Sequence, residues 1–197
     1  GEYDYLLNSN RQMDLLHKRF IVFELDNISE NRTLLPVVTI IIMETFLAKM
    51  RRLQGVRKVL LLEEAWKAIA KEGMASYVKY LYKTVRKYFG EAIVVTQEVE
   101  DIISSPIVKE SIINNADCKI LLDQRKYRNK FDQIQTLLGL TDKERAQVLS
   151  INLSNDPARR YKEVFISLGG VQSAVYATEV SLSLIHISEP TRHSLIS

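Results

Sequence analysis

The chain has 197 residues, of which 46% are hydrophobic and 26% charged, and its formal net charge is +3. These values fit one globular domain with a sizeable core. The sequence predicts no membrane-spanning helix, because Glu44 interrupts the longest apolar run, Pro36 to Met43, well before the ~20 residues that a span needs. Positive and negative residues are interleaved, so the net charge alone does not indicate nucleic acid. Cys118 has no second cysteine to pair with, which predicts a reduced thiol at the edge of the core and a cytoplasmic compartment.

Strand-like and helix-like blocks alternate along the first half of the chain. Hydrophobic periodicity and flanking Gly and Pro residues predict a strand over 19–26, a long amphipathic helix over 31–53 with Pro36 near its first turn, a strand over 56–62, a short helix over 64–71, a second helix over 74–89 that stops at Gly90, and a buried strand over 92–96. This alternation is typical of a mainly parallel sheet with helices on both faces.

The second half continues the pattern and ends in a hairpin. We expect short helices over 98–103 and 106–114, a strand over 118–122, a helix pair over 131–138 and 142–149 that is divided by Gly139, and strands over 161–168 and 172–178 that are joined by Gly169-Gly170. The predicted fold class is therefore α/β, with a mainly parallel sheet flanked by helices and a C-terminal β-hairpin.

The most informative motif is a pair of carboxylates after a buried strand. Glu63 and Glu64 follow the apolar run Val59 to Leu62, and Gln97 follows the next predicted strand. Open α/β sheets bind ligands at the carboxyl ends of their strands. In a P-loop NTPase the first acid would orient the Mg²⁺ shell, the second would polarise the attacking water, and Gln97 would sense the γ-phosphate. Paired acids also occur at ordinary helix N-termini, where they complement the helix dipole, so the motif alone leaves both interpretations open.

A phosphate-binding loop is not visible in this sequence. None of its seven glycines begins the Gly-x-x-x-x-Gly-Lys-Ser/Thr pattern that cradles phosphates. The chain also begins at Gly1 without an initiator Met, and its first segments are typical of the middle of a domain. We therefore expect a fragment whose phosphate-binding loop lies upstream.

Several segments together resemble one family, the TraG-type conjugation ATPases, which are large traffic ATPases of type IV secretion systems within the FtsK/HerA-like motor superfamily. The resemblance spans residues 1–181 and rests on five segments, which begin Gly1-Glu-Tyr-Asp-Tyr, Met13-Asp-Leu-Leu-His, Glu63-Glu-Ala-Trp, Val95-Thr-Gln and Asn114-Asn-Ala-Asp-Cys. It implies the C-terminal part of a RecA-like motor domain that uses ATP and Mg²⁺. It further implies a hexamer on the cytoplasmic face of the inner membrane, held there by channel proteins of the secretion system.

The resemblance also implies roles for individual residues. Glu63 matches the Walker B acid that contacts Mg²⁺ through water, Glu64 matches the catalytic carboxylate, and Gln97 matches the polar sensor. Many relatives have Asp where this chain has Glu63, so the reach of this carboxylate toward the metal shell differs. Arg125 and Arg128, just past the predicted strand over 118–122, are candidates for an arginine finger that contacts the nucleotide of a neighbouring subunit.

Two further segments carry weaker signals. In the segment 77–89, Lys79, Lys83, Arg86 and Lys87 fall at helical spacing among aromatic residues. This face could hold phosphates and stack bases, but a solvated helix surface is the preferred interpretation. The segment Leu182 to Arg192 resembles a translated sequencing adapter, so we expect residues 182–197 to be a non-native tail.

Three hypotheses for function follow. The first is an ATP-hydrolysing motor for conjugative transfer. The second is a DNA-translocating coupling or FtsK-like motor that uses a basic surface, and the third is a non-catalytic assembly scaffold. Fold alone does not choose among them, since the same architecture hosts many functions.

Overall fold

The structure is a computed structural model, and it describes residues 15–63, 72–97, 112–154 and 161–179. The chain divides into two compact units, Gly1–Asn115 and Ala116–Ser197, which are treated separately. Glu64, the expected short helix over 64–71, nearly all of the two expected over 98–114 and the expected tail over 182–197 lie outside the described residues.

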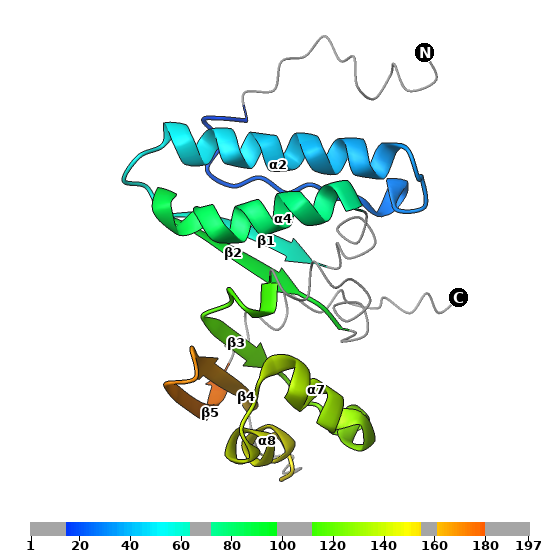
Figure 1. The fold of residues 1–197 in the computed structure, drawn as a ribbon, viewed down its shortest axis with the longest axis vertical. Helices are drawn as coiled ribbons and strands as arrows, with labels where there is room; N and C mark the ends of the chain where they lie inside the picture. The colour runs from blue at the N-terminus through cyan, green and yellow to red at the C-terminus, as the bar shows by residue number, and fades with distance from the viewer. Residues whose placement is uncertain (1–14, 64–71, 98–111, 155–160, 180–197) are drawn as a thin grey trace, which may run out of the picture. The chain divides into compact units, whose positions relative to one another are not determined.

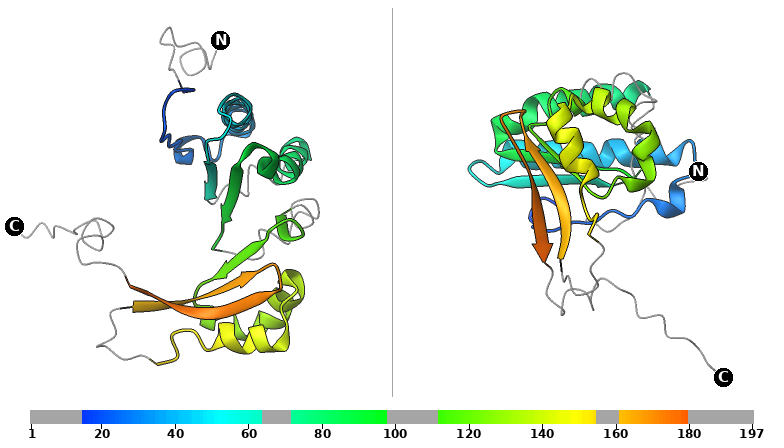
Figure 2. Two further views of the ribbon diagram at one scale, coloured as in Figure 1. Left: turned by 90° about the vertical axis from the view of Figure 1, so that its left-hand side faces the viewer. Right: turned by 90° about the horizontal axis from the view of Figure 1, so that it is seen from below.

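The first unit is built around a parallel strand pair. Its described elements are the short 3-10 helix η1 (Asp26–Ile28), α2 (Leu34–Arg52), β1 (Lys58–Glu63), α4 (Glu72–Thr84), the 3-10 helix η2 (Val85–Tyr88) and β2 (Gly90–Val95). β1 and β2 pair in parallel, with a register that runs from Lys58 opposite Gly90 to Glu63 opposite Val95. Helices α2 and α4 lie side by side along one face of this pair (Figures 1 and 2).

The core of the first unit lies between these helices and the strands. Met43, Leu47 and Met50 of α2 are spaced at four and three residues, so they fall on one helix face and are all buried. They pack with a buried set from α4, η2 and the segment that follows β2, namely Val78, Leu81, Tyr82, Val85 and Ile112. Leu60, Leu62, Ala92 and Val94 contribute the covered face of the strands.

The long helix α2 has the position expected from the sequence. The Asn31 side-chain oxygen accepts hydrogen bonds from the backbone nitrogens of Thr33 and Leu34, at 3.0 and 2.9 Å, and so satisfies two donors at the helix start. Pro36 lies in the first turn, where its missing N–H costs no helix hydrogen bond. No helix in the described ranges is long and apolar enough to cross a bilayer.

The prediction of a strand over 19–26 is wrong. Residues 18–25 form no strand or helix, and η1 begins at Asp26. Phe20 and Val22 are exposed, because the alternating pattern makes a strand only where a neighbouring strand completes its hydrogen bonds. The preceding residues are instead attached to α2, since the Lys49 ammonium donates to the backbone carbonyls of Leu15, at 2.6 Å, and of Lys18.

The second unit combines a three-stranded antiparallel sheet with two helices. Its described elements are β3 (Cys118–Leu121), the 3-10 helix η3 (Arg125–Lys130), α7 (Phe131–Leu138), α8 (Asp142–Leu149), β4 (Tyr161–Leu168) and β5 (Gln172–Glu179). The strand order is β3-β4-β5. The helix pair and the hairpin form as predicted, with Gly139 and both hairpin glycines at positive φ. β3 forms within the strand predicted over 118–122 and pairs antiparallel with β4, a pairing that the sequence did not predict.

The core of the second unit is formed by one face of this sheet and the two helices. Phe131 of α7 and Phe165 of β4 are fully buried. Val148 of α8 and Ile151, just after it, are buried beside them. Cys118, expected at the core edge, is exposed, because β3 places it on the same face as the exposed Ile120. The described strands and helices confirm the α/β class, with a helix-covered parallel pair and a C-terminal hairpin.

Candidate functional site

The predicted catalytic edge forms where two parallel strands end. Glu63 is the last residue of β1, and its register partner Val95 is the last residue of β2. Gln97 follows two residues after Val95, and both Glu63 and Gln97 are exposed. The parallel pairing therefore brings the predicted Mg²⁺-contacting residue Glu63 and the predicted sensor Gln97 to one edge of the sheet. Glu64, the third predicted residue, lies outside the described residues.

The side chain of Glu63 lies on the uncovered face of the strand pair. Along β1, Leu60 and Leu62 pack against the helical core, whereas Val59, Leu61 and Glu63 alternate with them and are exposed. The carboxylate thus remains accessible to solvent and to a ligand at the edge of the sheet. An aliphatic residue here would satisfy the strand equally well, so the acid is not required for packing.

This edge fits the way in which proteins hold Mg²⁺ with a nucleotide. Mg²⁺ keeps several waters and is bound through one or two carboxylates together with substrate phosphates. An exposed carboxylate such as Glu63 suits that arrangement. The described residues contain no group of three or more His, Cys, Asp or Glu residues that could hold a metal by themselves.

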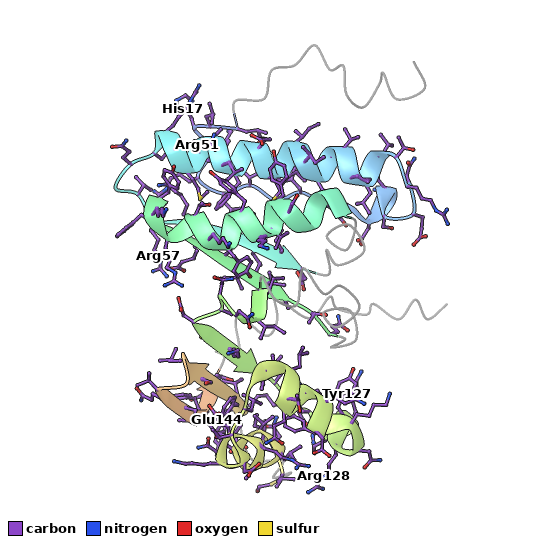
Figure 3. The ribbon with its side chains drawn as sticks, in the orientation of Figure 1. His17, Arg51, Arg57, Tyr127, Arg128 and Glu144 are labelled. Atoms are coloured by element: carbon purple, nitrogen blue, oxygen red, sulfur yellow. The ribbon has the colours of Figure 1, made fainter. Side chains whose placement is uncertain are left out.

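The two candidate finger arginines belong to the second unit and differ in their surroundings. The Arg125 guanidinium pairs with the carboxylate of Asp123 through Nε, at 2.8 and 2.9 Å, and through Nη2. This side-chain hydrogen bond from Arg125 lowers the pKa of Asp123 and raises that of Arg125. Arg128, on the same short helix η3, is exposed (Figure 3).

A cavity of mixed polar and apolar lining in the second unit was not predicted from the sequence. Its volume is about 370 Å³, and its lining includes Asp123, Arg125, Asn152, Tyr161, Lys162 and Glu163. The two acids already have partners, since Asp123 binds Arg125 and Glu163 accepts from the backbone nitrogen of Asn152 at 2.7 Å. The lining comes from four separated segments, and no sequence motif connects them. Arg125 therefore lines a cavity that is already formed in this structure.

Helix α4 has the surface that a solvated helix is expected to have. Val78, Leu81 and Val85 are buried, while Lys79 and Lys83 are exposed. This alternation of buried and exposed residues is that of an amphipathic helix, and what its exposed cations contact stays a prediction. The exposed cations remain available for other contacts.

Comparison with known proteins identifies the family. The model of the TraG P-loop domain matches residues 1–191, and the chain belongs to this family. Among solved structures, the chain is similar to VirB4 of Thermoanaerobacter pseudethanolicus, with a TM-score of 0.58 and 24% sequence identity. A comparison with curated proteins gives no match.

The structural similarity covers 84% of this chain but only 43% of the VirB4 chain, so this chain spans less than half the length of that relative. At this identity the similarity shows a shared fold. The fold class and the family expected from the sequence are therefore both confirmed. The residue roles stay predictions, as does the non-native origin of residues 182–197.

Proposed function

We propose that this chain is part of an ATP-hydrolysing motor that powers transfer through a type IV secretion system. The observation that carries the proposal is the parallel pairing of β1 and β2, which brings Glu63 and Gln97 to one carboxyl edge in a chain of the TraG P-loop family. That edge is the place where open α/β sheets bind ligands.

The residues predicted for this site divide the chemistry among them. Glu63 would hold Mg²⁺ through water, and the bound ion would supply positive charge that neutralises the nucleotide phosphates. Glu64 accepts a proton from the attacking water, and the Gln97 amide donates a hydrogen bond to a γ-phosphate oxygen. The phosphate-binding loop that completes the site would come from the longer protein.

An arginine from a neighbouring copy would complete the charge stabilisation in a hexamer. Arg128 is the simpler candidate, because Arg125 would first have to leave Asp123. The assembly would lie on the cytoplasmic face of the inner membrane and be held there by channel proteins.

The test uses the longer protein with its phosphate-binding loop. Glu64→Gln should abolish Mg²⁺-dependent ATP hydrolysis while leaving nucleotide binding within a few fold, since removing a general base costs about 10²–10⁴-fold in rate. Glu63→Gln should weaken Mg²⁺-dependent hydrolysis as well. Glu24→Gln, at an exposed position of the first unit, is the matched control and should be neutral. Undiminished turnover in Glu64→Gln would remove Glu64 from the mechanism.

Two other functions predict different results in the same assays. A DNA-translocating coupling motor should hydrolyse ATP faster when DNA is added. A non-catalytic scaffold should bind ATP without hydrolysing it in any variant.

A further inference from the structure

One end of the first unit gathers exposed cations from three separated segments. This basic end is defined by the C-terminus of α2, the last turn of α4 with η2, and the residue before β1, which supply Arg51, Arg52, Lys83, Arg86, Lys87 and Arg57. Figure 3 shows Arg51 and Arg57 at this same end. Glu91, which the strand register also places here, is paired with Arg57 at 2.7 Å.

The basic end is far from the candidate nucleotide edge. β1 begins at Lys58, beside Arg57, and ends at Glu63. At about 3.3 Å per residue, the strand separates the two ends by roughly 17 Å. A ligand at the basic end would therefore leave the carboxyl edge open for a nucleotide.

An exposed aromatic residue lies among these cations in an unusual backbone conformation. Phe89 has φ 58° and ψ 40°, the left-handed region that a bulky residue rarely adopts. Its backbone is held on both sides, because its nitrogen donates to the Arg86 carbonyl at 3.2 Å and its carbonyl accepts from the Lys58 nitrogen at 3.1 Å. The residue is nevertheless 64% exposed.

Packing of its ring does not explain why Phe89 occupies this position. A glycine would adopt the same backbone angles without strain, and the exposed ring adds little to the core. Side chains held in rare conformations cluster at binding sites, where the strain serves a purpose. Here the backbone, held by its bonds to Arg86 and Lys58, leaves the aromatic side chain exposed next to two segments that carry cations.

We propose that the basic end of the first unit binds single-stranded nucleic acid, with Phe89 stacking on a base and the surrounding cations holding the phosphates. Proteins bind single strands without sequence preference through this combination of aromatic platforms and positive charge. The cations hold the backbone, and their contribution falls with salt as counterions are released.

The observations favour a nucleic acid over an anionic membrane surface. Lipid binding by a surface helix requires a broad apolar face beside the cations. The apolar residues of α4 at this end, Leu81 and Tyr82, are instead buried against α2, and so is Val85 of η2. The exposed ring of Phe89 is better suited to stacking on one base than to insertion into a bilayer.

The test measures binding of a fluorescein-labelled 20-nucleotide oligothymidylate to the full chain by fluorescence anisotropy, between 50 and 200 mM salt. If about four phosphates are contacted, a plot of the logarithm of the association constant against the logarithm of the salt concentration should have a slope near −3. Arg86→Glu/Lys87→Glu should weaken binding at least about tenfold and reduce the slope by about 1 to 1.5. Lys143→Glu/Lys162→Glu makes the same change in net charge at exposed positions of the second unit and should have little effect.

Phe89→Gly separates stacking from charge. Glycine keeps the left-handed backbone, so the variant should fold, and it should lose about fivefold to a hundredfold in affinity with an unchanged salt slope. Phe89→Trp should retain the affinity. The proposal is overturned if Phe89→Gly binds as tightly as the parent, or if the two double variants behave alike. It is equally overturned if the chain binds phosphatidylserine vesicles but not the oligonucleotide.

Discussion

Lys58 is a buried lysine whose removal should destabilise the first unit. Its side chain is 8% exposed at the start of β1. The ammonium donates to the backbone carbonyl of Tyr88 at 2.8 Å and, more weakly, to that of Met50 at 3.4 Å. These carbonyls belong to the last turns of η2 and α2, so one side chain connects the ends of two helices to the first strand.

The expected cost of Lys58→Met follows from these contacts. A hydrogen bond from a charged donor contributes about 1.5–3 kcal/mol, and the 3.4 Å contact adds less. Met keeps most of the aliphatic packing and avoids burying an ammonium group, which offsets part of the loss. We therefore expect a net destabilisation of about 1–2 kcal/mol, a substantial fraction of the ~5–15 kcal/mol by which domains are stable.

Urea unfolding followed by far-UV circular dichroism measures this change. With a slope of about 1–3 kcal/mol per molar urea, the midpoint of Lys58→Met should fall by roughly 0.5–1 M. Lys79→Met, at an exposed position of α4, is the control and should shift stability by less than about 0.5 kcal/mol. A midpoint equal to that of the control, or higher, would show that the two carbonyl contacts do not outweigh the burial of the charge.

Two more predictions concern positions where close packing or a buried carboxylate is at stake. Gly90→Ala should destabilise the first unit by about 1–3 kcal/mol in urea unfolding, because an added Cβ would lie 2.7 Å from Val85 Cγ2 and 3.1 Å from its backbone oxygen. Gly55→Ala, which meets no atom within 4 Å, controls for loss of glycine but carries its own strain at φ 71°. A Gly90→Ala variant no less stable than Gly55→Ala would contradict the close-contact argument. Glu144 should contribute an acid-sensitive part of stability. Burial would raise the pKa of Glu144, but hydrogen bonds from Thr141, Ser167 and Ser173 lower this pKa below the ordinary value of 4.5. The carboxylate therefore stabilises the fold fully above pH 4.5, and this stabilisation is lost as the pH falls through the lower pKa of the folded state. Glu144→Gln should therefore make the melting temperature fall less steeply as the pH drops below about 4.5. The same fall in melting temperature as in the parent would refute this.

Local signals in the sequence determined much of the second unit. The predicted bounds of α7 and α8 agree with the structure, because each helix end is set by nearby residues. Gly139 closes α7 in the left-handed conformation at φ 65°, and Thr141 and Glu144 form a capping box at the start of α8. The glycine pair that turns the β4–β5 hairpin is an equally local signal.

The strand that ends at the first of the paired acids was predicted from its run of apolar residues. The prediction that this strand is buried is wrong, because Val59 and Leu61 are exposed. Its pairing with β2 then follows from the alternation of strands and helices. The family resemblance added the roles of Glu63, Glu64 and Gln97, which periodicity alone did not supply.

Tertiary structure decided the features that depend on partners far away in the chain. The run 19–26 alternates like a strand but forms none, because strand formation requires a neighbour that completes the ladder. β3 pairs antiparallel with β4, about forty residues later in the sequence.

The surfaces and cavities were likewise decided only in three dimensions. The helix over 74–89 was expected to stop at Gly90, yet the left-handed residue is Phe89. Gly90 instead begins β2, where Val85 and Met50 leave no room for a Cβ. The basic end and the cavity around Arg125 each combine segments that are separated in sequence. Composition and periodicity report what a segment prefers by itself, whereas such sites depend on which segments meet after folding.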